Sequence, residues 1–428
     1  MKRKGNIMIT KKTQTQNRSS RGAVSLFVVV FTALLFVTVT VGFTVLMLSN
    51  QQRATNNDLA QSALDSAQAG TEDAKRVLAK LADCQEKGLV ASDITCQAIS
   101  AAVTNGECNT VGRAMGETNS SGSPERLVQQ SADDKALEQA YTCVKIRPDT
   151  DSYIGKTKDE GEIRVIPLKS TAPFDKVRVS WLQRDDMSLA AGETPNFSIP
   201  RHDDGTIRLL GKDQWIGGID AADRALGKRG ALLRVQSIQY KPGDVNIRTI
   251  DENQRTAFLY PSEVGTNTVD LNTVDIHKPI FEDNRDAPID GVYNKPQLVQ
   301  CDKNRTSGYL CHADIRLVQG QDHFTYLTIA SVYRATSFQV ELMNNDDTVV
   351  KFKNVQPEID VTGRANDVFR RIVSRVESAD ANQAPYPRAE VGTGENMCKN
   401  YVITDDPDDY RDYSANACPD IINIKPTK

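Results

Sequence analysis

The sequence is poor in the residues from which catalytic sites are usually built. It has only 4 histidines and 2 tryptophans among 428 residues, and it contains neither an H-E-x-x-H nor a G-x-S-x-G motif. His312 directly follows Cys311, but a single histidine beside a predicted strand is more often structural than catalytic. We therefore expect a protein that is not an enzyme and that has no catalytic residue and no required cofactor.

Charge is absent from a long stretch near the N-terminus. No charged residue occurs between Arg21 and Arg53, and residues 22–48 are mainly Val, Phe, Leu, Ala, Thr and Gly. A helix of this length rises roughly 40 Å, which exceeds the about 30 Å hydrocarbon core of a bilayer. A cleaved signal peptide would have a shorter apolar region followed by an A-x-A-like site. We expect residues 22–48 to form a retained transmembrane helix.

Acidic residues are missing from the first 21 residues, which contain seven basic ones. The positive-inside rule therefore predicts that this basic leader (1–21) is cytoplasmic and that the bulk of the chain is extracytoplasmic. The formal net charge of −4 includes those seven positive charges, so residues 22–428 carry −11. Such an acidic field disfavours a broad nucleic-acid-binding face.

The eight cysteines include no C-x-x-C pair, which argues against zinc ribbons and thioredoxin-like sites. All follow the apolar run, so export favours disulfides; the alternative is that several are free buried thiols. They are Cys84, Cys96, Cys108, Cys143, Cys301, Cys311, Cys398 and Cys418. Cys301–Cys311 and Cys398–Cys418 are the expected local pairs, because each flanks a short loop. The first four cysteines leave three pairings open.

Proline is absent from residues 51–81, where small or apolar residues recur at spacings of three and four. These positions are Leu59, Ala63, Ala67, Gly70, Ala74, Val77, Leu78 and Leu81. They define one face of an amphipathic helix. We predict that the transmembrane helix continues through an amphipathic stalk at 49–83 as a single helix of about sixty residues.

A period of two replaces the helical pattern from about Ile163. The predicted strands are Ile163–Pro167, Val177–Leu182, Ala231–Tyr240, Val245–Ile250, Thr256–Tyr260, Leu298–Cys301, Leu310–Val318, Phe324–Tyr333, Phe338–Met343 and Val349–Val355. Asn and Asp at 344–347 predict a hairpin turn. The strand at 324–333 is apolar on both faces and should be central. Residues 368–376 fit both periods, and we favour a strand there.

These patterns predict an α+β protein, with a long N-terminal transmembrane and amphipathic helix followed by a mainly antiparallel β, disulfide-bonded ectodomain. Loops and short helices are expected at 84–150, where the sequence is polar and contains four cysteines. The β domain is expected at 151–428, as one unit or as two subdomains with a break near 261–297.

Two segments resemble a known family. RGAVSLFVVV (residues 21–30) and SAQAGTEDAK (residues 66–75) are similar to the N-terminal region of PilX-type minor pilins and of the large minor pseudopilin of type II secretion systems. In those proteins a basic leader ends in glycine, an apolar helix follows, and an A-x-A-G-x-x-x-A-like stretch continues that helix outside the membrane. The resemblance covers about residues 18–80, under a fifth of the chain.

The resemblance implies that the protein lies first in a membrane and later in a fibre. A prepilin peptidase would cleave after Gly22 and leave Ala23 as an N-methylated terminus, and the helix would later leave the bacterial cell membrane for a type IV pilus-like fibre. Its expected partners are membrane lipid, other pilin-like subunits, the prepilin peptidase, and a surface or host-cell ligand. The alternative is an uncleaved single-pass anchor for a surface receptor or adhesin.

One position departs from the family pattern. Major pilins have Glu at the fifth mature position, whereas this chain has Phe27. The large type II pseudopilin also lacks that carboxylate and caps the fibre tip. The departure, together with a bulky ectodomain, indicates a minor or tip subunit.

The last segment contains an acidic loop between two cysteines. Its carboxylates are Asp405, Asp406, Asp408, Asp409 and Asp412. Oxygen-rich loops bind Ca²⁺ when five or six ligands converge, so these residues are candidate calcium ligands, but their spacing fits no EF-hand and acidic loops are often simply solvated. Tyr401, Tyr410 and Tyr413 in the same loop either contact a surface or pack beneath the loop.

Overall fold

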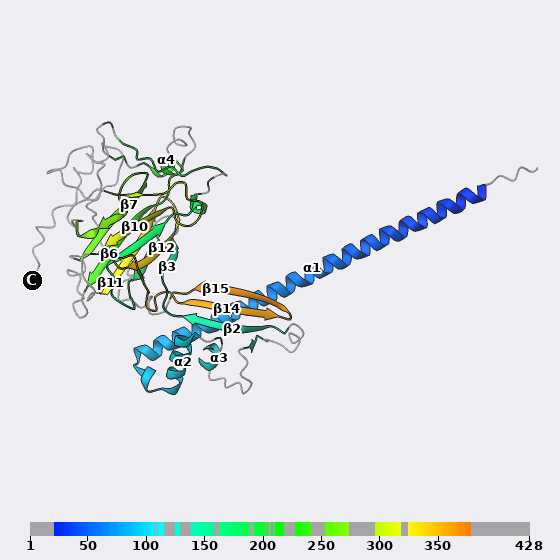
Figure 1. Ribbon diagram of the computed structural model, residues 1–428, viewed down its shortest axis with the longest axis horizontal. Helices are drawn as coiled ribbons and strands as arrows, with labels where there is room; N and C mark the ends of the chain where they lie inside the picture. Colours follow the sequence, from blue (N-terminus) through cyan, green and yellow to red (C-terminus); the bar gives the residue numbers. More distant parts are fainter. Residues whose placement is uncertain are drawn as a thin grey trace, which may run out of the picture.

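The structure is a computed structural model, and it describes residues 21–106, 108, 110–114, 125–128, 138–157, 162–187, 189, 192–201, 203, 207, 208, 210–217, 227–240, 253–273, 296–317 and 324–377. A long helix projects from two lobes (Figure 1). We name them the helix lobe, which surrounds the C-terminal half of the long helix, and the sandwich lobe, which lies between residues 148 and 357 of the chain.

The long helix, α1 (Arg21–Glu86), runs uninterrupted for 66 residues. The predicted continuity of its apolar and amphipathic halves is confirmed, as the absence of proline from both would suggest. At 1.5 Å per residue it is about 100 Å long. Threonines in the apolar half donate to carbonyls one turn back, Thr32 to Val28 and Thr40 to Phe36, each at 2.7 Å. These bonds satisfy the threonine hydroxyls within the helix, so they need no partner from apolar surroundings.

Three short helical elements follow α1. They are η1 (Leu89–Ala91), α2 (Ile94–Asn105) and α3 (Thr110–Ala114). α2 begins where Asp93 accepts a hydrogen bond from the amide of Cys96 at 2.9 Å, and it ends at Gly106 in the left-handed conformation. The expected short helices near residue 100 are therefore present.

The helix lobe is completed by one antiparallel sheet. Its strands lie in the order β1-β2-β14-β15, with bounds β1 (Arg126–Leu127), β2 (Ala140–Arg147), β14 (Glu358–Ala365) and β15 (Val368–Arg375). α1 packs across one face of this sheet, against β2, β14 and β15. The strand predicted at 368–376 is confirmed as β15. β2 and β14 are hydrogen-bonded neighbours although more than 200 residues separate them in sequence.

The sandwich lobe contains the remaining strands. They are β3 (Tyr153–Thr157), β4 (Ile163–Pro167), β5 (Lys176–Trp181), β6 (Leu232–Tyr240), β7 (Gln254–Ser262), β8 (Thr268–Asp270), β9 (Gln297–Gln300), β10 (Cys311–Arg316), β11 (Phe324–Val332), β12 (Thr336–Met343) and β13 (Val349–Val350), with short helices η3 (Arg184–Met187), α4 (Lys212–Ile216) and η4 (Leu271–Thr273). One sheet has the order β13-β12-β5-β10-β8, with β3 also paired to β12, and the other has the order β4-β11-β6-β7-β9.

The two sheets face each other across a shared apolar core. Trp181, Val179 and Phe338 of the first sheet belong to the same fully buried cluster as Val235 and Leu327 of the second. Each strand alternates between this core and the outer face, which is the period of two seen in the sequence. β11 pairs with β4 on one side and β6 on the other, so its predicted central position is confirmed.

The sheets are mixed, which corrects the expectation of a mainly antiparallel ectodomain in one respect. β8 pairs with β10 and β9 pairs with β7 in parallel, while the other pairings between named strands are antiparallel. Both exceptions are short strands at the edges of their sheets. The predicted turn at 344–347 is a hairpin between β12 and β13, in which Asp347 has φ 65°. The strand predicted at 245–250 lies outside the described residues.

The helix lobe is built from two separate stretches of the chain, one before and one after the sandwich lobe. β2 ends at Arg147, the chain builds the sandwich lobe, and it then returns to the helix lobe at Glu358, the register partner of Arg147. The sandwich lobe is therefore inserted between two neighbouring strands of the helix lobe. The two crossings are held together by Gln356, whose side-chain amide donates to the Ile154 carbonyl and accepts from the Ile154 amide.

Candidate functional site

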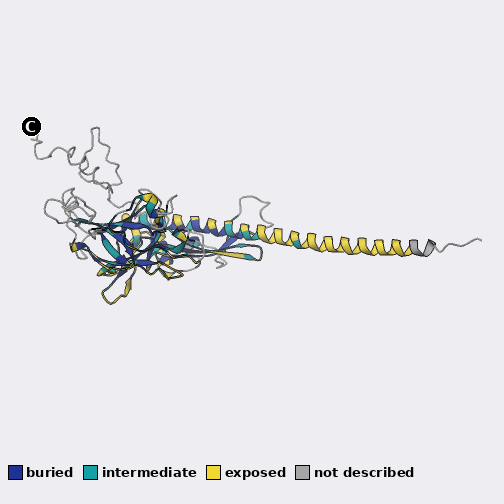
Figure 2. Cartoon of the chain, turned by 90° about the horizontal axis from the view of Figure 1, so that it is seen from above, coloured by how far each residue is buried: buried dark blue, intermediate teal, exposed yellow. Residues whose placement is uncertain are grey.

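The N-terminal half of α1 exposes apolar side chains on every side (Figure 2). The exposed large residues are Leu26, Phe27, Val28, Val29, Val30, Phe31, Leu34, Leu35, Phe36, Val37, Val39, Val41, Phe43, Val45, Leu46, Met47 and Leu48. An 18-residue stretch of this segment has a mean hydropathy of 2.6, and none of its residues is buried. By length and composition the helix could cross a membrane, which is consistent with a membrane anchor. Such an apolar surface needs an environment other than water.

The C-terminal half of α1 meets the sheet at two glycines. A Cβ on Gly363 of β14 would lie 2.1 Å from the Ala63 carbonyl oxygen and 2.4 Å from the Ala67 nitrogen. A Cβ on Gly70 would lie 2.8 Å from Val361. Helix and strand backbones therefore approach as closely as glycine allows. The β2–β14 ladder shifts register at the same place, where Thr142 is the extra residue on β2 between the partners of Thr362 and Gly363. This contact determines which part of α1 packs on the sheet.

A polar contact secures the same packing from the side. The Tyr141 hydroxyl of β2 donates to the Asp73 carboxylate of α1 at 2.8 Å. Arg76 also donates to Asp73 at 3.0 Å. Burial, and then the adjacent Asp73 carboxylate, raises the pKa of Tyr141 well above its ordinary value. The hydroxyl is therefore protonated at neutral pH and serves as a donor.

Two disulfides fasten the helix lobe. Cys84–Cys96 joins the end of α1 to α2, and Cys108–Cys143 joins the α2–α3 turn to β2. The sequence left this pairing open among three arrangements. The loops they close span 12 and 35 residues, for which the chain-entropy treatment gives roughly 3 and 4 kcal/mol of stabilisation. No free cysteine occurs among the described residues, and disulfides are typical of an extracytoplasmic domain.

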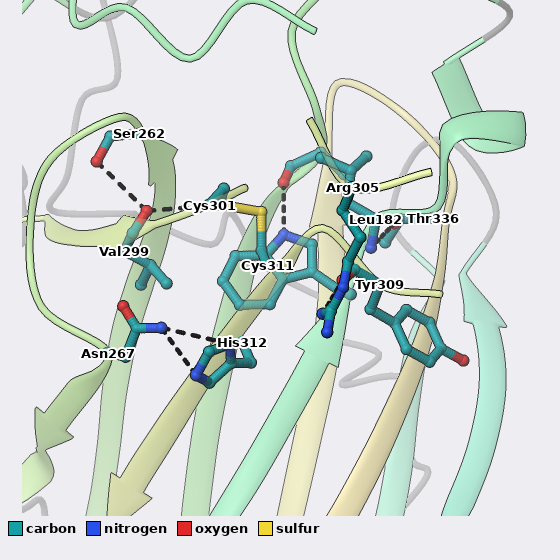
Figure 3. The surroundings of a disulfide bond; sticks show 12 residues. Leu182, Ser262, Asn267, Val299, Cys301, Arg305, Tyr309, Cys311, His312 and Thr336 are labelled. Carbon is teal, nitrogen blue, oxygen red and sulfur yellow. Dashed lines mark hydrogen bonds between the residues drawn. A yellow bond between two sulfur atoms is a disulfide. The ribbon is translucent and has the colours of Figure 1, made fainter. Parts of the chain in front are cut away.

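The third disulfide, Cys301–Cys311, forms as predicted and lies in the sandwich lobe (Figure 3). It closes the loop between β9, in one sheet, and β10, in the other. A cavity of about 540 Å³ lies beside it. Its polar lining includes Asn267, Gln300, Asp302, Lys303, Arg305 and His312.

The cavity walls are held by backbone hydrogen bonds. Asp302 donates its amide to the Leu310 carbonyl at 2.8 Å, and its side chain accepts from the Asn304 amide at 3.0 Å. In the loop before β8, between the lining residues Glu263 and Asn267, Gly265 has φ 132°, and a Cβ there would overlap the Leu298 carbonyl oxygen. The loop before β8 is therefore pressed onto β9, and the cavity is formed before any ligand arrives.

His312 lies at the base of this cavity on β10. The Asn267 side-chain nitrogen is 2.8 Å from His312 Nε2, and the two side chains point toward each other in Figure 3. Burial, and then the cationic Arg178 side chain, lowers the pKa of His312 below its ordinary value. The ring is neutral at pH 7 and can accept one hydrogen bond and donate another.

The other predicted site residues are placed as follows. Gly22 and Ala23 lie in the first turn of α1, and Phe27 is 72% exposed, one turn further along. Cys398, Cys418, the candidate calcium ligands at 405–412 and the three tyrosines of that loop lie outside the described residues. Within the described part of the chain, no group of three or more His, Cys, Asp or Glu side chains could hold a metal ion.

The sequence did not indicate the cavity. Its polar residues come from three separate segments, around 263–267, 300–305 and 310–312, and none belongs to a recognisable motif. The short loop between Cys301 and Cys311 was the only signal at this position.

No family model matches this chain, and no curated protein or solved structure matches it.

Proposed function

We propose that this protein is a pilin-like subunit, anchored in the bacterial cell membrane by α1 before assembly and then incorporated as a minor or tip component of a type IV pilus-like fibre. The observation that carries the proposal is the division of α1. Its second half is seated on its own sheet through Gly363 and Gly70, whereas its first half has no partner within the described residues.

In such a protein, one helix must be stable both in lipid and in a bundle of helices. An all-round apolar surface is stable in lipid, and it is equally stable within a bundle of similar helices from which water is excluded. A helix that served only as an anchor would need about 20 apolar residues and no rigid continuation. Here the apolar half continues without a break into the lobe that would be presented outside the membrane.

Two features support a minor or tip position over the main shaft. Phe27 stands where a shaft pilin would have the glutamate that pairs with a neighbouring amine, so this chain cannot make that ion pair. The sandwich lobe, inserted between β2 and β14, adds bulk that repeated close stacking along a shaft would have to accommodate. The role proposed is structural and interactive, in assembly priming or surface contact, and not enzymatic.

The alternative is an uncleaved single-pass receptor or adhesin that uses the same ectodomain. The seven basic residues at positions 1–21 would hold such a protein across the bilayer with its N-terminus in the cytoplasm. The two functions differ in what happens at Gly22.

The state of the N-terminus tests the proposal. The full chain is expressed in bacterial membranes together with a prepilin peptidase that processes its own pilin, and its intact mass is measured. Loss of residues 1–22 and one added methyl group at Ala23 is expected. Gly22→Val should abolish the cleavage, and Gly42→Val, in the middle of the apolar half where a Cβ would meet no neighbour within 4 Å, should not. A terminus at Met1 under these conditions would overturn the fibre proposal and leave the anchor.

A further inference from the structure

We propose that the cavity beside the Cys301–Cys311 disulfide is a binding site for a neutral saccharide of one or two sugar rings. The site lies wholly within the sandwich lobe, so the proposal does not depend on whether the protein enters a fibre.

Size and shape are the first argument. The volume of about 540 Å³ lies within the roughly 300–1,000 Å³ of small-molecule sites in proteins. The walls are preformed, because the disulfide, the turn at Asp302 and the close contact of Gly265 with β9 hold them in place. A ligand would not have to order these loops on binding.

The lining selects the ligand chemistry. Apart from Leu310 and the disulfide sulfur of Cys301, the described lining consists of amide, carboxylate, cationic and imidazole side chains. Polar side chains thus make up most of the lining, and it contains no Phe, Tyr or Trp ring on which a nucleobase could stack. It presents hydrogen-bond donors and acceptors side by side, which is what vicinal hydroxyl groups require.

Charge excludes a strongly ionic ligand. Glu263 and Asp302 balance Lys303 and Arg305, and His312 is neutral at pH 7. Lys303 is moreover paired with Glu263 at 2.9 Å. The cavity therefore has no net charge with which to attract a phosphate, a polyanion or a cation.

Several polar groups in the cavity are available to a ligand. The Gln300 side chain is exposed and makes no hydrogen bond within the described residues, and the Asn267 oxygen accepts none there. Both His312 ring nitrogens lie near the Asn267 side-chain nitrogen, at 2.8 and 3.3 Å, so the imidazole orients that amide. Amides, a carboxylate and a neutral imidazole directed into one space form a coherent set of partners for sugar hydroxyls.

The position of the cavity fits an external ligand. Cys311 is paired with Trp181 at one end of β5. β3, the first strand after the helix lobe, runs toward that end, because its last residue Thr157 pairs with Thr336 at the start of β12. The cavity thus opens at the end of the sandwich away from the crossing to the helix lobe.

Saturation-transfer NMR of the full chain tests the proposal. The protein is held in a zwitterionic detergent without a sugar headgroup, and the probes are the methyl glycosides of glucose, galactose, mannose and N-acetylglucosamine, with inorganic phosphate as the ionic comparison. Transfer to at least one glycoside is expected, with a dissociation constant of about 0.1–10 mM, typical of a few hydrogen bonds exchanged with water.

Variants locate the binding. Gln300→Ala and Asn267→Ala should each weaken it by roughly three- to tenfold, which is the loss of one hydrogen bond to a neutral group. Gln339→Ala is the matched control, since Gln339 lies on the same outer face of the sheet as His312, two strands away, and it should bind like the wild type. The proposal is overturned if no glycoside binds, if neither cavity variant weakens binding, or if only phosphate occupies the site.

Discussion

At the scale of single residues, glycine and alanine decide how α1 meets its sheet. Ala63, Ala67 and Ala74 are fully buried, and Gly363 of β14 touches the helix backbone itself. Larger side chains at these positions would push the helix away from the sheet, and the neighbouring side chains would lose their packing contacts. The seven-residue spacing of Ala63, Gly70 and Val77 in the sequence reflects this demand for small or apolar residues on one face.

Gly363→Ala should therefore destabilise the helix lobe by about 1–3 kcal/mol, because the new Cβ would overlap backbone atoms that cannot rotate away. Hydrogen exchange of α1 residues 63–74 in the full chain in detergent measures the change as faster exchange. Gly211→Ala is the control, since a Cβ there would meet nothing within 4 Å and should change stability by less than about 0.5 kcal/mol. Equal exchange in both variants would show that the close contact does not stabilise the lobe.

At the scale of elements, the β14–β15 hairpin has an ion pair between a buried carboxylate and an exposed arginine in addition to its backbone ladder. Arg371 of β15 donates to both carboxylate oxygens of Asp360 on β14, at 2.7 and 2.6 Å. The Asp360 side chain is only 9% exposed, whereas that of Arg371 is 63% exposed. The hydrogen bonds from Arg371 hold the pKa of Asp360 below its ordinary value of 3.8.

This pair predicts an acid-sensitive hairpin. A carboxylate whose pKa is lower in the folded than in the unfolded state stabilises the fold fully above about pH 5, and this stabilisation is lost as the pH falls below about 4 toward the folded-state pKa. In Asp360→Asn the helix lobe should be less stable at pH 7, and its stability should depend less on pH between 5 and 3, as measured by hydrogen exchange of β14. Glu72→Gln, at an exposed position on α1, should keep the wild-type pH profile. If Asp360→Asn keeps it too, Asp360 does not account for the acid sensitivity.

Some of the helices and strands could be predicted from the sequence, and others could not. α1 could be predicted because absent charge and absent proline are strong local signals, and β11 because a strand that is apolar on both faces belongs in the middle of a sheet. The pattern of β15 fitted a helix as well as a strand, so only a preference for the strand could be stated. β14 was missed, since Gly363, which contacts α1, interrupts its apolar pattern. The pairing of β2 with β14 could not be foreseen, because the residues between them form a lobe of their own. The cavity was hidden for the same reason, since its walls meet only after the two sheets pack.

At the scale of the whole molecule, the insertion makes the helix lobe a complete unit without the sandwich lobe. Arg147 and Glu358 are directly opposite each other in the β2–β14 ladder, and partners in an antiparallel pair lie about 5 Å apart. A two-residue turn can bridge that distance.

Replacing residues 148–357 by Asn-Gly should therefore leave a folded helix lobe with both of its disulfides. Intact mass with and without reduction counts the disulfides, and hydrogen exchange of α1 reports on the fold. Slow exchange at residues 63–74, as in the full chain, is expected. A control in which the same turn joins Arg147 to Val368, and so deletes β14, should lose that protection. Rapid exchange in the first protein would mean that the two lobes fold only together.

The two disulfides of the helix lobe also determine how the molecule would bear mechanical tension. If the apolar end of α1 is held while the sandwich lobe is pulled, the load passes from Cys84 to Cys96, along α2 to Cys108, and across to Cys143 at four residues from the crossing at Arg147. The intervening stretches 85–95 and 109–142 are bypassed and cannot be drawn out. Between α1 and the sandwich lobe, only residues 97–107 and the end of β2 after Cys143 then remain in series, so the two disulfides limit how far the helix lobe can be extended under traction.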